Sequence, residues 1–132
     1  MAKARILLDT HCWLWLLAEP SRFSPRTLKT VSSGETELFL SAASLWEVAI
    51  KHDLGKLKLP EEPAVYMPAK MTELAVQELA ITGAHALAAG SLPRHHADPF
   101  DRLILAQAKI EGLSLLSSDR IFVRYGVKLL PL

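Results

Sequence analysis

The sequence predicts an α/β protein in which a parallel sheet is covered by helices on both faces. Short apolar runs that resemble strands alternate with helical patterns along the whole chain, and this alternation is typical of parallel sheets, whose strands are joined by helices. The chain is also 132 residues long and half apolar, which suits one domain with a core of its own. We therefore expect a single domain over residues 1–132.

The first half of the chain is expected to hold two strands and three helices. The apolar run before Asp9 ends at a polar turn, as a buried strand does, and the run after it lacks the alternation of a strand. Ser24 followed by Pro25 is a typical helix start, and Ser44-Leu-Trp-Glu47 has the pattern of another. We expect strands over 5–8 and 37–41, and helices over 11–18, about 25–32 and about 44–52.

The second half contains the strongest helical pattern of the chain. A helix that starts at Asp98-Pro99 presents apolar residues at helical spacing and stops at Gly112. The remaining expected elements are a helix that follows the 56–63 loop and runs to about Gln77, strands over 78–81, 113–117 and 127–130, a brief helix near 85–90, and a helical turn or two over 119–125.

Charge and cysteine content bear on partners and compartment. The 15 Lys and Arg residues against 14 Asp and Glu leave a net charge of +1, so nucleic-acid contact would have to come from local basic clusters or bridging metal ions. Cys12 is the only cysteine, the N-terminus lacks a signal-peptide layout, and the longest apolar run, 12–18, is shorter than the roughly 18 residues that cross a bilayer. These features predict a cytoplasmic protein with no membrane span.

Acidic residues lie at four places where a predicted strand ends or a predicted helix begins. They are Asp9, Glu47, the pair Asp98 and Asp101, and Asp119. Because the ends of parallel strands share one edge of a sheet, these side chains are expected to converge there. Crowded carboxylates repel one another, and a divalent cation with oxygen ligands relieves the repulsion. Since no Cys and His pairs have zinc spacing, the set predicts a site for Mg²⁺ or Mn²⁺.

Each acid taken alone has a second interpretation, as a helix cap. Ser44 and Glu47 have the spacing of a capping box. Asp98 precedes a proline at the first helical position, and Asp101 lies near the positive end of the same helix dipole. The other two acids could cap the helices that they precede. Capping does not explain why all of them are acidic, because Ser, Thr or Asn would cap without the charge. The joint pattern therefore favours a metal site.

The histidines and tryptophans are less specific. The pair His95 and His96 could ligate a metal, but its position beside Pro93-Arg94 favours a solvated loop. The three tryptophans, Trp13, Trp15 and Trp46, could stack on bases. Since they lie inside apolar runs, we interpret them as core or interface residues, and we expect a partner to cover part of the segment 12–17 and Trp46.

Four stretches of the chain, in this order, resemble the PIN-domain family and in particular VapC-like toxins of toxin–antitoxin pairs. Together they cover nearly the whole chain. They are LLDTHCWLWLL at 7–17, SAASLWEVAIKHDLGKL at 41–57, LPRHHADPFDRLILAQA at 92–108 and LLSSDRIFVRYGV at 115–127. One departure from the family pattern is Ala97, where an arginine is common.

The resemblance implies a three-layer α/β/α fold, an acidic site for one or two Mg²⁺ or Mn²⁺ ions, and hydrolysis of RNA. It also implies a homodimer and a small antitoxin as protein partner. By matched position it assigns catalytic and metal-binding roles to Asp9, Glu47, Asp101 and Asp119. The role of Asp98 stays divided between ligand and cap. Ser117 matches a position that would hold a water on the metal.

The expected reaction is attack by metal-activated water, which leaves a 5′-phosphate and a 3′-hydroxyl. Among the basic residues near the motifs, Arg102 is our first choice to hold the RNA backbone, although it could instead pair with a neighbouring acid.

Two other classes of protein fit the sequence less well. A phosphoacceptor receiver domain would need a pair of acids early in the chain, and Asp9 has no acidic neighbour. A PIN scaffold that binds a partner without cutting RNA is the second alternative, and the complete set of acids argues against it.

Overall fold

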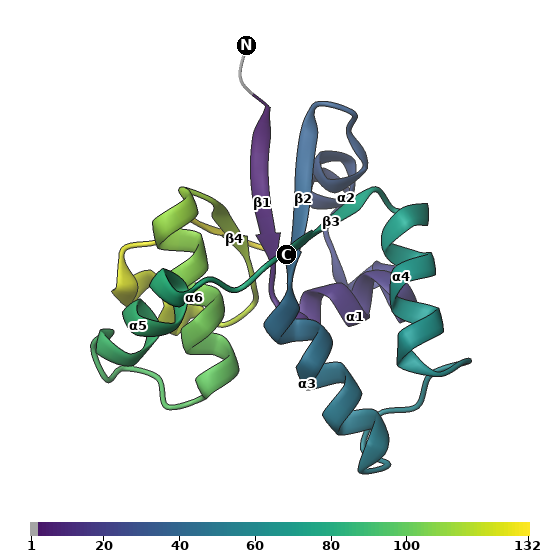
Figure 1. Cartoon of the computed structure of the whole chain (residues 1–132). Helices are drawn as coiled ribbons and strands as arrows, with labels where there is room; N and C mark the ends of the chain where they lie inside the picture. The colour runs from purple at the N-terminus through teal and green to yellow at the C-terminus, as the bar shows by residue number, and fades with distance from the viewer. Residues whose placement is uncertain (1–2) are drawn as a thin grey trace.

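The structure, a computed structural model that describes residues 3–132, contains a five-stranded sheet in which every strand is parallel to its neighbours. The order across the sheet is β3-β2-β1-β4-β5, with β1 in the centre (Figure 1). The predicted parallel sheet is thus confirmed. The strands are β1 (Ala4–Leu8), β2 (Thr36–Ser41), β3 (Val76–Leu79), β4 (Ser114–Leu116) and β5 (Leu129–Leu130).

Helices cover both faces of the sheet and give three layers, α/β/α (Figure 1). Ile6 and Leu8 lie in one apolar cluster together with Trp13, whereas Leu7 lies in the other, together with Ile104. This alternation follows the two-residue period of a strand. The first face is covered by α1 (Thr10–Ala18), α2 (Pro25–Ser32) and α4 (Pro63–Glu73), and the second by α6 (Pro99–Glu111), with α5 (Gly83–Ser91) beside α6.

The predicted start and stop signals of two helices are confirmed. The Ser24 hydroxyl accepts a hydrogen bond from the amide of Thr27, and Pro25 is the first residue of α2. Helix α6 begins at Pro99 and ends before Gly112, whose φ of 66° lies in the left-handed region that favours glycine. With 13 residues, α6 is the longest helix within residues 3–132, and none in that range is long and apolar enough to cross a membrane.

The predicted start of the third helix is wrong. Helix α3 (Ala42–Asp53) follows β2 directly and is capped by Ser41, whose hydroxyl accepts from the amide of Ala43. Ser44 lies inside the helix, where its hydroxyl accepts a hydrogen bond of 2.9 Å from Thr10. The capping-box interpretation of Ser44 and Glu47 is therefore overturned, because Glu47 lies a full turn inside α3.

The third strand lies earlier than predicted. Helix α4 ends at Glu73 rather than near Gln77, and Ala75 makes the turn into the strand with a positive φ of 54°. Val76 then pairs with Leu38 of β2, so that β3 covers 76–79 instead of 78–81. The pairing with β2 fixes this register, and local propensity does not reveal it.

The strand order reverses next to β1. The chain builds β2 and β3 on one side of β1 and then returns to place β4 and β5 on the other side. In open parallel sheets, such a reversal leaves a crevice at the carboxyl ends of the two strands that flank it. Here those strands are β1 and β4, and the 3₁₀ helix η2 (Arg120–Tyr125) follows β4 closely. A second 3₁₀ helix, η1 (Pro20–Arg22), joins α1 to α2.

Candidate active site

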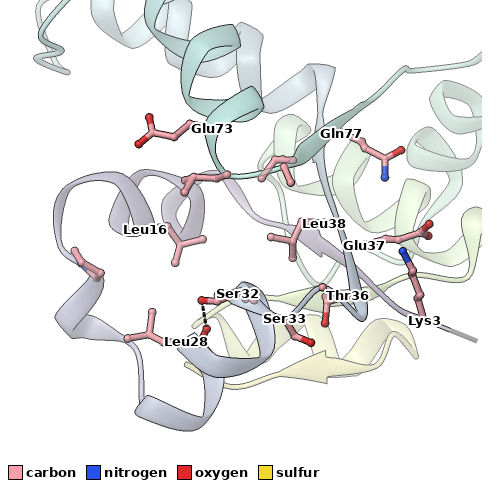
Figure 2. Close-up of a pocket in the computed structure, with 16 residues that line it drawn as sticks. Lys3, Leu16, Leu28, Ser32, Ser33, Thr36, Glu37, Leu38, Glu73 and Gln77 are labelled. Carbon is pink, nitrogen blue, oxygen red and sulfur yellow. Dashed lines mark hydrogen bonds between the residues drawn. The ribbon is translucent and has the colours of Figure 1, made fainter.

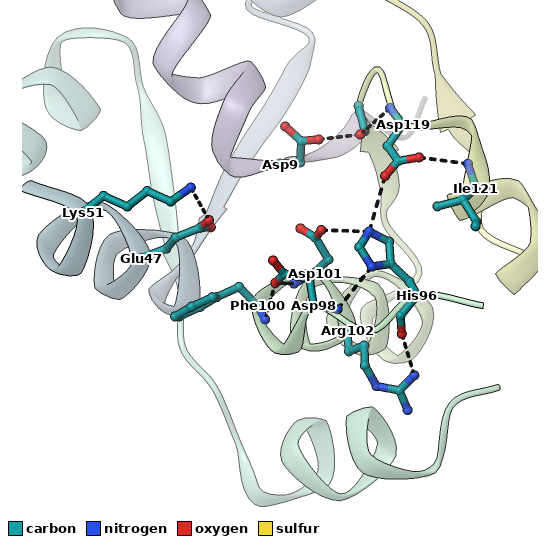
Figure 3. A network of polar contacts seen from close by, with 11 residues as sticks. Asp9, Glu47, Lys51, His96, Asp98, Phe100, Asp101, Arg102, Asp119 and Ile121 are labelled. Atoms are coloured by element: carbon teal, nitrogen blue, oxygen red, sulfur yellow. Dashed lines mark hydrogen bonds and ion pairs between the residues drawn. The ribbon is translucent and has the colours of Figure 1, made fainter. Parts of the chain in front are cut away.

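The predicted acidic side chains converge at the carboxyl ends of β1 and β4 (Figure 3). Asp9 follows β1 directly, and Asp119 follows β4 after a two-residue turn. Glu47 reaches the site from α3, and Asp98 and Asp101 reach it from the start of α6. The acids thus come from four segments that are distant in sequence, and the fold gathers them as the parallel sheet predicts.

Asp9 is both a helix cap and a site residue. Its Oδ1 accepts a 2.7 Å hydrogen bond from the amide of Cys12, in the first turn of α1, and its Oδ2 accepts from the hydroxyl of Ser117. The Ser117 oxygen in turn accepts from the amide of Asp119 at 3.1 Å. Ser117 is fully buried. Its two hydrogen bonds position Asp9 and Asp119 relative to each other.

Glu47 carries a buried oxygen without a partner. The residue is 6% exposed; its Oε2 forms a 2.8 Å ion pair with Nζ of Lys51, one turn along α3. Its Oε1 has no hydrogen-bond partner within the described part of the chain. A buried carboxylate oxygen in this state is costly, so it is a natural ligand for a cation.

The two acids of α6 have different roles. Asp98 is the cap, because its Oδ1 accepts from the amides of Phe100 and Asp101, at 2.9 and 3.1 Å. The Asp101 carboxylate takes no part in capping and faces the other acids (Figure 3). Burial raises the pKa of Asp101 to about 7, and the negative charge of Asp98 and, more weakly, of Glu47 and Asp9 adds to this rise, against the effect of His96. The negative charge of the carboxylates in the site thus exceeds the positive charge of the residues around them.

His96, which the sequence pattern assigned to a solvated loop, lies in the site. Its Nε2 lies 3.0 Å from Oδ2 of Asp101 and 3.3 Å from Oδ2 of Asp119. Its ring stacks on Phe122 of η2, with centroids 5.6 Å apart and an angle of 26° between the planes. The expectation of a solvated loop is therefore wrong for His96. The one available signal was its position, two residues before the cap Asp98.

Arg102 has a different role from the two that were expected. Its guanidinium donates hydrogen bonds of 2.9–3.2 Å to four acceptors, and all four are backbone carbonyls. These carbonyls belong to Ala89, Leu92, Pro93 and His96. Arg102 thus ties the end of α5 and the following loop to α6, and both of its terminal nitrogens donate to backbone carbonyls.

The donors present suit a hard divalent cation, because they are carboxylate oxygens from four segments, Asp9, Glu47, Asp101 and Asp119. The unpartnered oxygen of Glu47 and the raised pKa of Asp101 both fit a site that lacks a positive charge. Within residues 3–132, no three acidic, histidine or cysteine side chains are placed to hold an ion as they stand. The imidazole of His96 lies between two of the acids instead.

Two hollows in the surface have different chemistry. The depression at the acids has a volume of about 290 Å³, and its walls include Asp9, Asp101 and Asp119. A larger groove, of about 650 Å³, lies at the amino ends of the strands, where Leu16, Leu38 and other apolar side chains line it (Figure 2). We place the chemistry in the smaller depression, because it alone of the two holds the converging acids.

Comparison with known proteins gives one consistent result. The sequence model of the PIN domain matches residues 6–128. The chain is 33% identical over 118 residues to ribonuclease VapC22 of Mycobacterium tuberculosis, a match that covers 87% of each chain.

Two solved structures share the fold. One is VapBC2 from Rickettsia felis bound to a DNA fragment from its promoter, with a TM-score of 0.73 and 15% identity over 96% of this chain and 98% of that one. The other is DNA-bound VapBC from Salmonella typhimurium, with a TM-score of 0.71 and 17% identity over 97% of this chain and 98% of that one.

Proposed function

Because the chain belongs to the PIN-domain family, we propose that it is an endoribonuclease that hydrolyses RNA phosphodiester bonds and serves as the toxin of a toxin–antitoxin pair. The observation that carries the proposal is the convergence of Asp9, Glu47, Asp101 and Asp119 at the switch point of the sheet (Figure 3). The relative VapC22 is named a ribonuclease, and this chain has the acids that phosphodiester hydrolysis with a divalent cation requires.

We further propose that Mg²⁺ or Mn²⁺ is the cofactor and that those four acids hold it. An ion there would supply a Lewis acid for the scissile phosphate and would make water a better nucleophile. Asp98 acts chiefly as the cap of α6, because its Oδ1 is taken by two amides. Ser117 keeps Asp9 oriented. The Lys51 ion pair fixes one oxygen of Glu47, and the other has no hydrogen-bond partner among residues 3–132.

The RNA backbone would be held by basic residues other than Arg102. Arg94 lies in the loop before Asp98, and Arg120 and Arg124 lie in η2 after Asp119; all three are exposed. Because these arginines flank the acids, they can attract the RNA backbone and so offset its repulsion by the carboxylates. They need not lower the affinity of the acidic site for a cation.

The proposed partners are an antitoxin and a second copy of the chain. The antitoxin proposal is supported by the structural relatives, which are VapBC complexes. Of the apolar residues expected to need a cover, Cys12 and Trp13 are buried in the core, but Trp46 is 61% exposed and contacts Phe100 edge to face. Trp46 is therefore the clearest remaining candidate for an interface residue.

The decisive experiment is a cleavage assay on the antitoxin-free chain with 5′-labelled RNA. We expect cuts in Mg²⁺ or Mn²⁺ that leave 5′-phosphate and 3′-hydroxyl ends, no cuts in EDTA, and none with Asp101→Asn. Undiminished cleavage in excess EDTA would refute the metal mechanism. If the chain binds antitoxin but leaves every RNA intact, it is a binding module instead.

A further inference from the structure

The imidazole of His96 lies in the place that a cation would take between two of the acids. Nε2 is 3.0 Å from Oδ2 of Asp101 and 3.3 Å from Oδ2 of Asp119, so that one ring nitrogen contacts both carboxylates (Figure 3). The acids come from α6 and from the turn after β4, and His96 is the side chain that connects them.

The other ring nitrogen shows which form the imidazole takes. Nδ1 of His96 accepts a hydrogen bond from the backbone amide of Asp98, at 3.2 Å. An acceptor nitrogen carries no hydrogen, so the hydrogen of the neutral ring is on Nε2. Nε2 therefore donates to the carboxylates and has no lone pair to offer a metal ion. In this position His96 competes with a cation for the oxygens and cannot serve as its ligand.

The surroundings hold the ring in place. One face stacks on Phe122, and the backbone carbonyl of His96 accepts from Arg102 at 3.2 Å. The same guanidinium binds three further carbonyls of the α5 end and the loop. Since the backbone is tied down in this way, the ring would have to leave the acids by a rotation of its side chain.

We propose that His96 is a built-in occupant of the acidic site that a divalent cation must displace, and that it thereby sets the metal affinity of the enzyme. The proposal rests on the proposed function, because it takes the four acids to be the metal site. His96 is a positioning residue: it holds Asp101 and Asp119 in the cation-free protein, and it leaves both when the cation arrives.

The first test is the affinity for Mn²⁺, measured by electron paramagnetic resonance on the full chain. His96→Ala should bind Mn²⁺ about ten-fold more tightly than the unchanged protein, because the ion no longer has to break a hydrogen bond to charged acceptors. His96→Gln, whose amide can donate from the place of Nε2, should stay close to the unchanged protein, and the shorter His96→Asn should behave like the alanine variant. His95→Ala is the matched control, since His95 lies in the same loop as His96 but packs against Tyr125 of η2.

The outcomes separate this inference from the proposed function. If the unchanged protein binds Mn²⁺, Asp101→Asn does not, and His96→Ala binds no more tightly than the unchanged protein, the occupant role is refuted and the metal site stands. Weaker binding by His96→Ala would make His96 a ligand and would also refute the role. If no variant binds Mn²⁺, both proposals fail.

A second measurement needs only the unchanged protein. In protein labelled with ¹⁵N-histidine, nuclear magnetic resonance should show the hydrogen of His96 on Nε2, and saturating Mg²⁺ should shift the ring signals of His96 but leave those of His95 in place. Signals of His96 that stay unchanged while calorimetry records Mg²⁺ binding would overturn the proposal.

Discussion

The hydroxyl of Ser117 donates a hydrogen bond to Oδ2 of Asp9, although the two residues are 108 positions apart in the sequence. The same oxygen accepts from the amide of Asp119. One buried serine thus couples the ends of the two strands at the switch point and fixes the orientation of an acid on each.

Replacing Ser117 by alanine should lower the cleavage rate while the fold stays intact. Loss of the hydrogen bond frees the Asp9 carboxylate to rotate, and loss of a residue that orients metal ligands typically costs about 10–100-fold in activity or metal affinity. Single-turnover cleavage and Mn²⁺ binding would measure the effect. Ser118→Ala is the control, because Ser118 is exposed and should retain full activity. A fully active Ser117→Ala would show that Asp9 is held well enough by the amide of Cys12.

Asp101→Asn should abolish cleavage and stabilise the metal-free protein at high pH. The pKa of Asp101 is about 7 in the folded protein against an ordinary value of 3.8. Between pH 3.8 and about 7, the folded state therefore holds a proton on Asp101 that the unfolded state has lost. The free energy of unfolding falls as the pH rises from about 4 to above 7. The asparagine variant lacks this loss. It should be more stable than the unchanged protein by about 1–3 kcal/mol at pH 8, after allowance for solvent screening of a partly exposed group.

Denaturant unfolding in EDTA at pH 4.5, 6 and 8 would check this, and the difference between the two proteins should shrink toward the lowest pH. A constant difference at all three values would mean that Asp101 titrates like an ordinary carboxyl. Less stability together with near-normal cleavage would mean that Asp101 serves the helix dipole and not the chemistry.

Asp98 should respond to substitution as a cap. Asp98→Asn preserves the acceptor for the amides of Phe100 and Asp101, so stability should stay within about 0.5 kcal/mol, whereas Asp98→Ala should lose about 0.5–2 kcal/mol. We expect the asparagine variant to keep more cleavage activity than Asp101→Asn. A rate as low as that of Asp101→Asn, in a protein of normal stability, would make Asp98 a metal ligand.

Arg102→Met should destabilise the protein without weakening RNA binding directly. The variant removes the donors to four carbonyls, and hydrogen bonds from a charged group typically contribute about 1.5–3 kcal/mol. Thermal unfolding would measure the loss, and RNA affinity would be measured under conditions where the variant is fully folded. Arg120→Ala is the comparison: Arg120 is exposed, so its loss should weaken RNA binding and leave stability nearly unchanged. If Arg102→Met instead kept its stability and lost RNA affinity, Arg102 would be a phosphate contact.

Local sequence determined most of the secondary structure and the identity of the acids. Helix starts such as Ser24-Pro25 and Asp98-Pro99 depend on hydrogen bonds within a single turn, so the residues that make them are adjacent in the sequence. The parallel sheet likewise follows from the alternation of short apolar runs with helices, because strands joined in this way pair side by side in one direction. From that sheet, the convergence of the acids could be predicted without coordinates.

The tertiary structure alone decided what lies between the acids and what holds them. The start of α3 at Ala42, the insertion of His96 between Asp101 and Asp119, and the clamp of Arg102 on the loop all depend on partners brought together by packing. When the partners of a side chain lie in another element, the sequence around it does not show whether it is solvated or paired. Periodicity reports which face of an element is buried, but not which polar group of a distant element meets it there.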